Sequence, residues 1–134
     1  MLIDIRGLIS GLPNPDDIVE RMRKKRGYLL PEWEVMARLD PDYAEKYDEL
    51  YSIVLGSERR VPIRYKELIA IVALAARGEE EGVAAHIRRA IKNGADINEV
   101  VEALEVGVIA TGTPTFFYGL KVIAEMSKKG ELKV

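Results

Sequence analysis

Apolar side chains recur at three- and four-residue spacings along most of the chain, which is the pattern of amphipathic helices. No segment alternates between apolar and polar residues for long enough to predict a strand. The sequence therefore predicts an all-α fold, in which proline and glycine separate about seven helices. The expected helices cover approximately residues 16–25, 31–39, 41–54, 63–77, 79–93, 97–110 and 114–126.

Residues that favour helix termini support several of these boundaries. Asp40 and Asp96 each precede an apolar-periodic segment and are predicted N-caps, because a short carboxylate accepts the free N–H groups of a first turn. Thr113 is predicted to cap the last helix, with Pro114 as its first residue. Residues 127–134 are mostly charged, and we expect them to fray.

The distribution of apolar residues also predicts where the core lies. Residues 63–77 are apolar on nearly every side, so this helix is expected to be buried on several sides, and the last four helices are expected to form the core. The predicted organisation is an N-terminal arm and short helix over residues 1–30, a helical domain over 31–128 and a charged tail over 129–134. The arm over residues 1–12 and the row Tyr43, Tyr47 and Tyr51 are candidate subunit contacts.

Composition excludes several classes of function. The formal net charge of −2 gives no electrostatic reason to expect a nucleic-acid or anionic-membrane partner. The chain has no cysteine, so it has no thiolate nucleophile and no redox pair, and its single histidine excludes a histidine-rich metal site. The longest apolar run, Leu68 to Ala76, is too short to cross a bilayer, and a cytoplasmic protein is expected.

His86 is the one side chain that titrates near neutral pH without perturbation. Helical geometry places it at the edge of the apolar stripe formed by Val83, Ile87 and Ala90. Two interpretations follow: a boundary histidine that bonds a backbone carbonyl, or a general acid. Glu67 is the second candidate, because it is either an ordinary glutamate at a helix start or a carboxyl in a partly dry site.

Three further residues are candidates for binding a small acidic molecule. Thr113 lies in a turn whose free N–H groups could hold a carboxylate, and Tyr118 could add a hydroxyl donor. Arg64 belongs to a basic cluster that could clamp an acidic substrate. The alternative interpretation is simple capping, aromatic packing and a solvated basic cluster. Glu99, Glu102 and Glu105 are interpreted as a solvated stripe, unless an arginine pairs with one of them.

From Pro41 to about Ala124 the chain resembles the carboxymuconolactone decarboxylase family, which includes alkylhydroperoxidase D. The resemblance rests on the order and spacing of short motifs rather than on any single motif. They are Pro62-x-x-x-Lys66-Glu67-Leu68-Ile69, His86-x-Arg88-x-Ala90, Asn93-Gly94-Ala95, the Glu99 to Leu104 run and Gly112-x-Pro114. The resemblance implies an alkylhydroperoxidase D-like helical bundle and a homo-oligomer, which we expect to be a trimer of dimers.

The family has two chemical branches. In the peroxidase branch a Cys-x-x-Cys-x-x-His motif exchanges disulfides with the help of a glutamate one helix earlier. His86 and Glu67 match that histidine and glutamate, but Glu80 and Val83 occupy the cysteine positions. Neither side chain can attack a peroxide, so thiol peroxidase activity is disfavoured.

The decarboxylase branch lacks the cysteines, keeps the histidine and uses no cofactor or metal. The resemblance implies that His86 supplies a proton while Glu67 sets its tautomer. This branch usually places a glutamate one turn before the histidine, where this chain has Gly82. The sequence therefore predicts a cofactor-free lyase acting on a small carboxylated lactone or a related acid. The alternative is a non-enzymatic oligomeric member that binds a small molecule or a partner.

Overall fold

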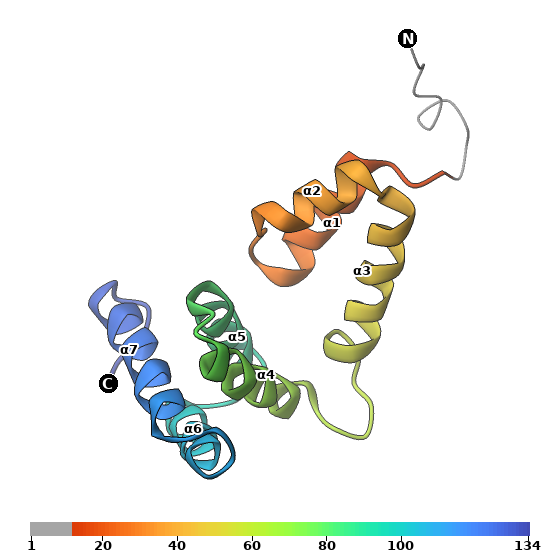
Figure 1. Cartoon of the computed structure of the whole chain (residues 1–134). Coiled ribbons are helices and arrows are strands. Elements are labelled where there is room, and N and C mark those ends of the chain that lie inside the picture. The colour runs from red at the N-terminus through yellow and green to blue at the C-terminus, as the bar shows by residue number, and fades with distance from the viewer. Residues whose placement is uncertain (1–11) are drawn as a thin grey trace. The chain divides into compact units, whose positions relative to one another are not determined.

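A computed structural model describes residues 12–134, so the predicted arm over residues 1–12 lies almost wholly outside the described part. Residues 12–134 contain seven helices and no strand, which confirms the predicted all-α fold (Figure 1). The helices are α1 (Pro15–Arg26), α2 (Pro31–Leu39), α3 (Pro41–Leu55), α4 (Ile63–Arg77), α5 (Glu80–Lys92), α6 (Ile97–Thr111) and α7 (Thr113–Lys128).

Most helix boundaries follow from residues that the sequence marks. Asp40 accepts from the Tyr43 N–H at 3.1 Å, and Asp96 accepts from the N–H groups of Asn98 and Glu99, so both predicted N-caps are confirmed. The predicted cap at Thr113 is wrong. Thr113 is the first residue of α7, and Gly112 precedes it with a φ of 99°, so the turn uses a glycine conformation instead of a capping side chain.

The described chain divides into two compact units. One unit holds α1, α2 and α3 and ends at Ser57, and the other begins at Glu58 and holds α4 to α7. No helix of the described residues combines the length and the apolar character needed to cross a membrane.

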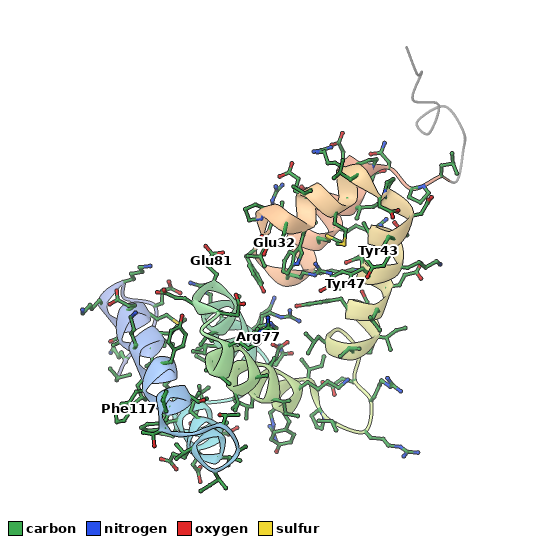
Figure 2. The ribbon with its side chains drawn as sticks, in the orientation of Figure 1. Glu32, Tyr43, Tyr47, Arg77, Glu81 and Phe117 are labelled. Carbon is green, nitrogen blue, oxygen red and sulfur yellow. The ribbon has the colours of Figure 1, made fainter. Side chains whose placement is uncertain are left out.

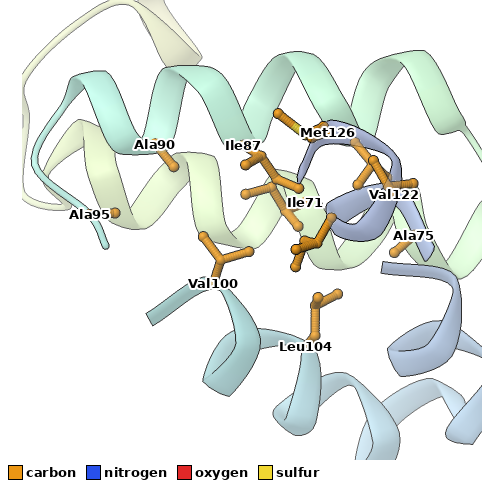
Figure 3. Close-up of a cluster of buried hydrophobic side chains, with 11 residues drawn as sticks. Ile71, Ala75, Ile87, Ala90, Ala95, Val100, Leu104, Val122 and Met126 are labelled. Atoms are coloured by element: carbon orange, nitrogen blue, oxygen red, sulfur yellow. The ribbon is translucent and has the colours of Figure 1, made fainter. Parts of the chain in front are cut away.

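The second unit has a core built from all four of its helices, as predicted (Figure 3). Ile71 of α4, Ile87 of α5 and Leu104 of α6 are fully buried, and Val122 of α7 is 2% exposed. Gly119 lies directly against Leu104, since a Cβ at position 119 would come within 2.6 Å of Leu104 Cδ2. This glycine therefore lets α6 and α7 approach closely.

Helix α4 packs against α5, α6 and α7, as expected for a helix buried on several sides, but one narrow side stays exposed. Ile71 and Ala75 are buried against α5, α6 and α7, but Ile69 is 63% exposed. The exposed side is a stripe that also includes Tyr65 and Ala73, and it faces outward within the unit. Phe117 of α7 is likewise 61% exposed and points outward from its helix (Figure 2).

The C-terminal segment is more ordered than its charge suggests. Helix α7 continues to Lys128, Leu132 packs on the core, and Arg88 Nε donates to Glu131 at 2.6 Å. The expected fraying from residue 127 is therefore wrong. An apolar anchor and a two-contact ion pair hold this segment against α5.

The ion pair between Arg88 and Glu131 predicts a stability difference that depends on pH. The hydrogen bond from Arg88 lowers the pKa of Glu131. A lowered carboxyl pKa in the folded state stabilises the protein above the ordinary carboxyl range, and this contribution is lost as the pH falls through the lowered value. Glu131→Gln should therefore have a slightly lower Tm than the wild type at neutral pH and the same Tm in acid. An equal Tm difference at both pH values would contradict this prediction.

The first unit is organised around a buried arginine. Ile18, Met22, Ala37 and Ala44 form a small apolar core, and the Arg26 side chain beside it is fully buried. The guanidinium carbon of Arg26 lies within 4.0–5.4 Å of three aromatic ring centres, namely those of Trp33, Tyr47 and Tyr51.

The predicted tyrosine row is therefore split in this chain. Tyr47 and Tyr51 are half-buried against the arginine, and Tyr43 is 61% exposed (Figure 2).

Asp48 provides the negative charge in this cluster. Arg26 Nη2 donates to Asp48 Oδ1 at 3.3 Å, and Lys25 Nζ donates to Oδ2 at 2.8 Å. Arg26 Nε and Nη1 are buried and have no hydrogen-bond acceptor among residues 12–134. Burial lowers the pKa of Arg26. Asp48 and the surrounding tyrosines offset this lowering only in part.

Candidate functional site

The most prominent buried polar contact in the second unit joins His86 to Glu67. His86 Nδ1 lies 2.5 Å from Glu67 Oε2, and the two residues are 4% and 0% exposed. An ionised carboxylate can only accept a hydrogen bond, so Nδ1 carries the hydrogen when Glu67 is ionised. The contact then leaves Nε2 as the ring nitrogen that can exchange a proton with a reactant.

Local sequence explains why these two side chains meet. Glu67 lies in the second turn of α4 and occupies the same helix face as the core residue Ile71, four residues later. His86 lies beside Val83 and Ile87 on the buried face of α5, which packs along α4. The predicted position of His86 at the buried face is confirmed. Its partner is a carboxylate, and not the backbone carbonyl that one interpretation expected.

Arg89 completes a chain of three charged or polar side chains. Its Nη2 lies 3.0 Å from Glu67 Oε1, and its side chain is 16% exposed. Arg89 follows His86 by three residues on α5, so both side chains lie on the side of the helix that faces Glu67. Sequence reasoning missed Arg89, although its i, i+3 spacing from the candidate histidine was a usable signal.

Arg64 does not join this chain of contacts. It lies one turn before Glu67 on α4, where its guanidinium packs over the Tyr65 ring at 4.7 Å and donates to the Tyr65 hydroxyl at 2.8 Å. That hydrogen bond raises the pKa of Arg64. Its predicted role as a substrate contact stays a prediction.

Tyr118 is placed away from Glu67 along α4. The Tyr118 hydroxyl donates at 2.9 Å to the carbonyl of Gly78, which ends α4. At about 1.5 Å per residue, Gly78 lies about 16 Å from Glu67 along the helix axis. Thr113 is exposed at the start of α7. Within this chain the structure therefore does not gather all five predicted residues at one place.

The acidic residues of α5 and α6 lie toward solvent. Glu102 and Glu105 are exposed and Glu99 is half-buried, as expected for a solvated stripe. Glu81 is exposed in the first turn of α5 and extends away from the helix (Figure 2). Residues 12–134 contain no cluster of three or more histidine or acidic side chains that could hold a metal ion.

Gly82 lies on the buried side of α5, one turn before His86. A Cβ at this position would come 3.0 Å from Leu74 Cδ1 of α4, which is tighter than ordinary packing. Gly82 stands where the resemblance to the decarboxylase branch would place a glutamate. The close contact between α4 and α5 leaves little room for a larger side chain there.

The arrangement of His86, Glu67 and Arg89 can move a proton. A carboxylate fixes the orientation of the imidazole, an arginine balances the carboxylate, and Nε2 is left to donate or accept. Such a site suits a reaction that needs one acid–base group in a partly dry setting.

Comparisons with known proteins agree with this fold. The sequence model of the carboxymuconolactone decarboxylase family matches residues 41–125, which is more than half of the chain. A similar solved structure is a candidate carboxymuconolactone decarboxylase from Burkholderia xenovorans LB400. It has a TM-score of 0.73 and 24% sequence identity, and the match covers 90% of this chain and all of that one. No curated protein matches the sequence. The chain belongs to the carboxymuconolactone decarboxylase family.

Proposed function

We propose that this protein is a cofactor-free decarboxylase that acts on a small carboxylated lactone or a related acid. The observation that carries the proposal is the buried contact between His86 Nδ1 and Glu67 Oε2, which fixes the ring and leaves Nε2 for chemistry. The match to the carboxymuconolactone decarboxylase family supports the choice of reaction.

The reaction makes modest physical demands. The bond between the carboxylate carbon and the lactone breaks, carbon dioxide leaves, and the electron pair moves into the conjugated lactone. A proton then adds to a carbon of the product. In this proposal Nε2 of His86 donates that proton, and Glu67 stabilises the protonated ring before it does so. Arg64, Thr113 and Tyr118 stay candidate contacts for the substrate carboxylate, and a homo-oligomer, as a trimer of dimers, remains part of the proposal.

The loss of 4-carboxymuconolactone, followed by ultraviolet absorbance, tests the proposal. Wild-type protein should consume the substrate, and His86→Ala should lose on the order of 10²–10⁴-fold in kcat because its proton donor is gone. Lys92→Ala, an exposed change at the end of the same helix, serves as the matched control and should keep the wild-type rate. Circular dichroism should show that all three proteins are folded.

Two outcomes would overturn the proposal. Equal turnover by wild type and His86→Ala would exclude His86 as the proton donor. No turnover by the wild type would exclude this lactone, and saturable binding of it without loss of absorbance would favour the non-enzymatic interpretation.

A further inference from the structure

One side of α4 presents an apolar stripe without a charged side chain. The α4 stripe consists of exposed residues at three- and four-residue spacings along the helix, namely Tyr65, Ile69, Ala73 and Ala76. Ile69 is 63% exposed. In a chain with 31% charged residues, a solvent-facing helix side normally carries lysine or glutamate at some of these positions. Their absence is typical of the centre of a protein interface.

The apolar surface continues from α4 onto α6. Tyr65 of α4 and Val106 of α6 line a shared groove, whose other lining residues are Leu68, Ala103 and two glutamates of α6. Val106 is 69% exposed, and Ile109, one turn further along α6, is 90% exposed. Exposed apolar residues that adjoin one another on two helices mark an interaction surface, whereas single ones do not.

The order of side-chain sizes along the α4 stripe indicates what can cover it. The two large side chains, Tyr65 and Ile69, lie in its first half. The two small ones, Ala73 and Ala76, lie in its second half. A second α4 that runs in the opposite direction would therefore place each large side chain against a small one. A parallel partner would place the two tyrosines against each other and leave a gap between the alanines.

We propose that two copies of this protein associate through the α4 stripe, with their α4 helices antiparallel. A two-fold axis near the middle of the stripe pairs Tyr65 with Ala76 of the partner subunit, and Ile69 with Ala73 of the partner subunit, and each pair forms twice. The antiparallel arrangement also sets opposite ends of the two helix dipoles side by side. This inference gives the homo-oligomer of the proposed function a specific surface, and it rests on that part of the proposal alone.

Light scattering at micromolar protein tests whether the stripe joins two copies. Ala73→Arg places a long charged side chain where the partner's Ile69 must pack, so the dissociation constant should rise by at least about 100-fold. The measured mass should then be half that of the wild type, whether the wild type is a dimer or a trimer of dimers. Ala124→Arg is the matched control, because Ala124 is an exposed alanine of α7 outside the stripe, and it should keep the wild-type mass.

Introduced cysteines test the antiparallel register. The chain has no cysteine, so every disulfide joins two introduced thiols. An oxidised mixture of Ile69→Cys and Ala73→Cys proteins should give a covalent dimer with one chain of each kind, because antiparallel α4 helices bring these positions within disulfide range. A mixture of Ile69→Cys and Lys92→Cys should give far less, since Lys92 is exposed at the end of α5.

Three results would overturn the inference. A monomeric wild type would overturn it together with the proposed homo-oligomer. A wild-type oligomer whose mass is unchanged in Ala73→Arg would overturn it alone, because the copies would then meet through another face. Equal yields of covalent dimer from the two cysteine mixtures would overturn the antiparallel pairing, and these mixtures decide if Ala73→Arg does not fold. None of these measurements requires turnover, so the lactone assay decides the proposed reaction independently.

Discussion

Asp48→Ala is expected to destabilise the first unit by about 3–5 kcal/mol. The substitution removes the carboxylate that pairs with Arg26, whose side chain is fully buried. Arg26 Nε and Nη1 already have no acceptor among the described residues, so the guanidinium would lose its nearest negative charge. Contacts with Trp33 and Tyr51 would remain, but aromatic rings offset only part of the cost of a buried cation.

Trp33 makes this prediction straightforward to measure. It is the only tryptophan of the chain and lies 4.4 Å from the Arg26 guanidinium carbon, so its fluorescence reports on this cluster during urea unfolding. Glu49→Ala is the matched control, because Glu49 is exposed on the same helix and its one ion pair within residues 12–134 is with the exposed Lys46. Its transition should hardly move. If the urea midpoint of Asp48→Ala also stays close to that of the wild type, the carboxylate of Asp48 does not stabilise the buried Arg26.

Leu104→Ala is expected to destabilise the second unit by about 2–5 kcal/mol. Leu104 is fully buried where α6, α4 and α7 meet, and truncation leaves a cavity that the neighbouring helices can fill only in part. Circular dichroism during urea unfolding measures the decrease in the free energy of unfolding.

A second substitution tests the same contact from the opposite side. Gly119→Ala should itself cost about 1–3 kcal/mol, because its new Cβ would meet Leu104 Cδ2 at 2.6 Å. In the double variant the methyl group at position 119 occupies space that Leu104 vacates. The double variant should therefore be more stable than the sum of the two single effects predicts. Simple additivity would show that Leu104 and Gly119 do not share this space.

Local chemistry explains how much of the fold the sequence predicts. Asp40, Asp96 and the glycine after Arg77 act through their immediate neighbours, so the boundaries that they set could be predicted. The exposure of Ile69 could not be predicted, because it depends on which sides of α4 the other helices cover. The order of residues 127–134 depends in the same way on a partner, Arg88, far away in the sequence.

The candidate site was predictable to a similar extent. The apolar stripe of α5 placed His86 at the buried face, and the family resemblance paired it with Glu67. The contact of Arg89 with Glu67 joins two helices and could not be predicted from α5 alone, although its spacing of three residues from His86 sets it apart from the exposed Arg88. Arg26 was missed for the same reason, since a basic residue in the last turn of a helix is typical of a solvent-exposed position.

The tight contact at Gly82 also bears on how the sequence can change. A glutamate at this position would require the end of the Leu74 side chain to move, so that single replacement should cost stability. A smaller side chain at position 74 would provide that room directly. We therefore expect substitutions at positions 74 and 82 to be epistatic, so that a change at one position alters what the other can accept.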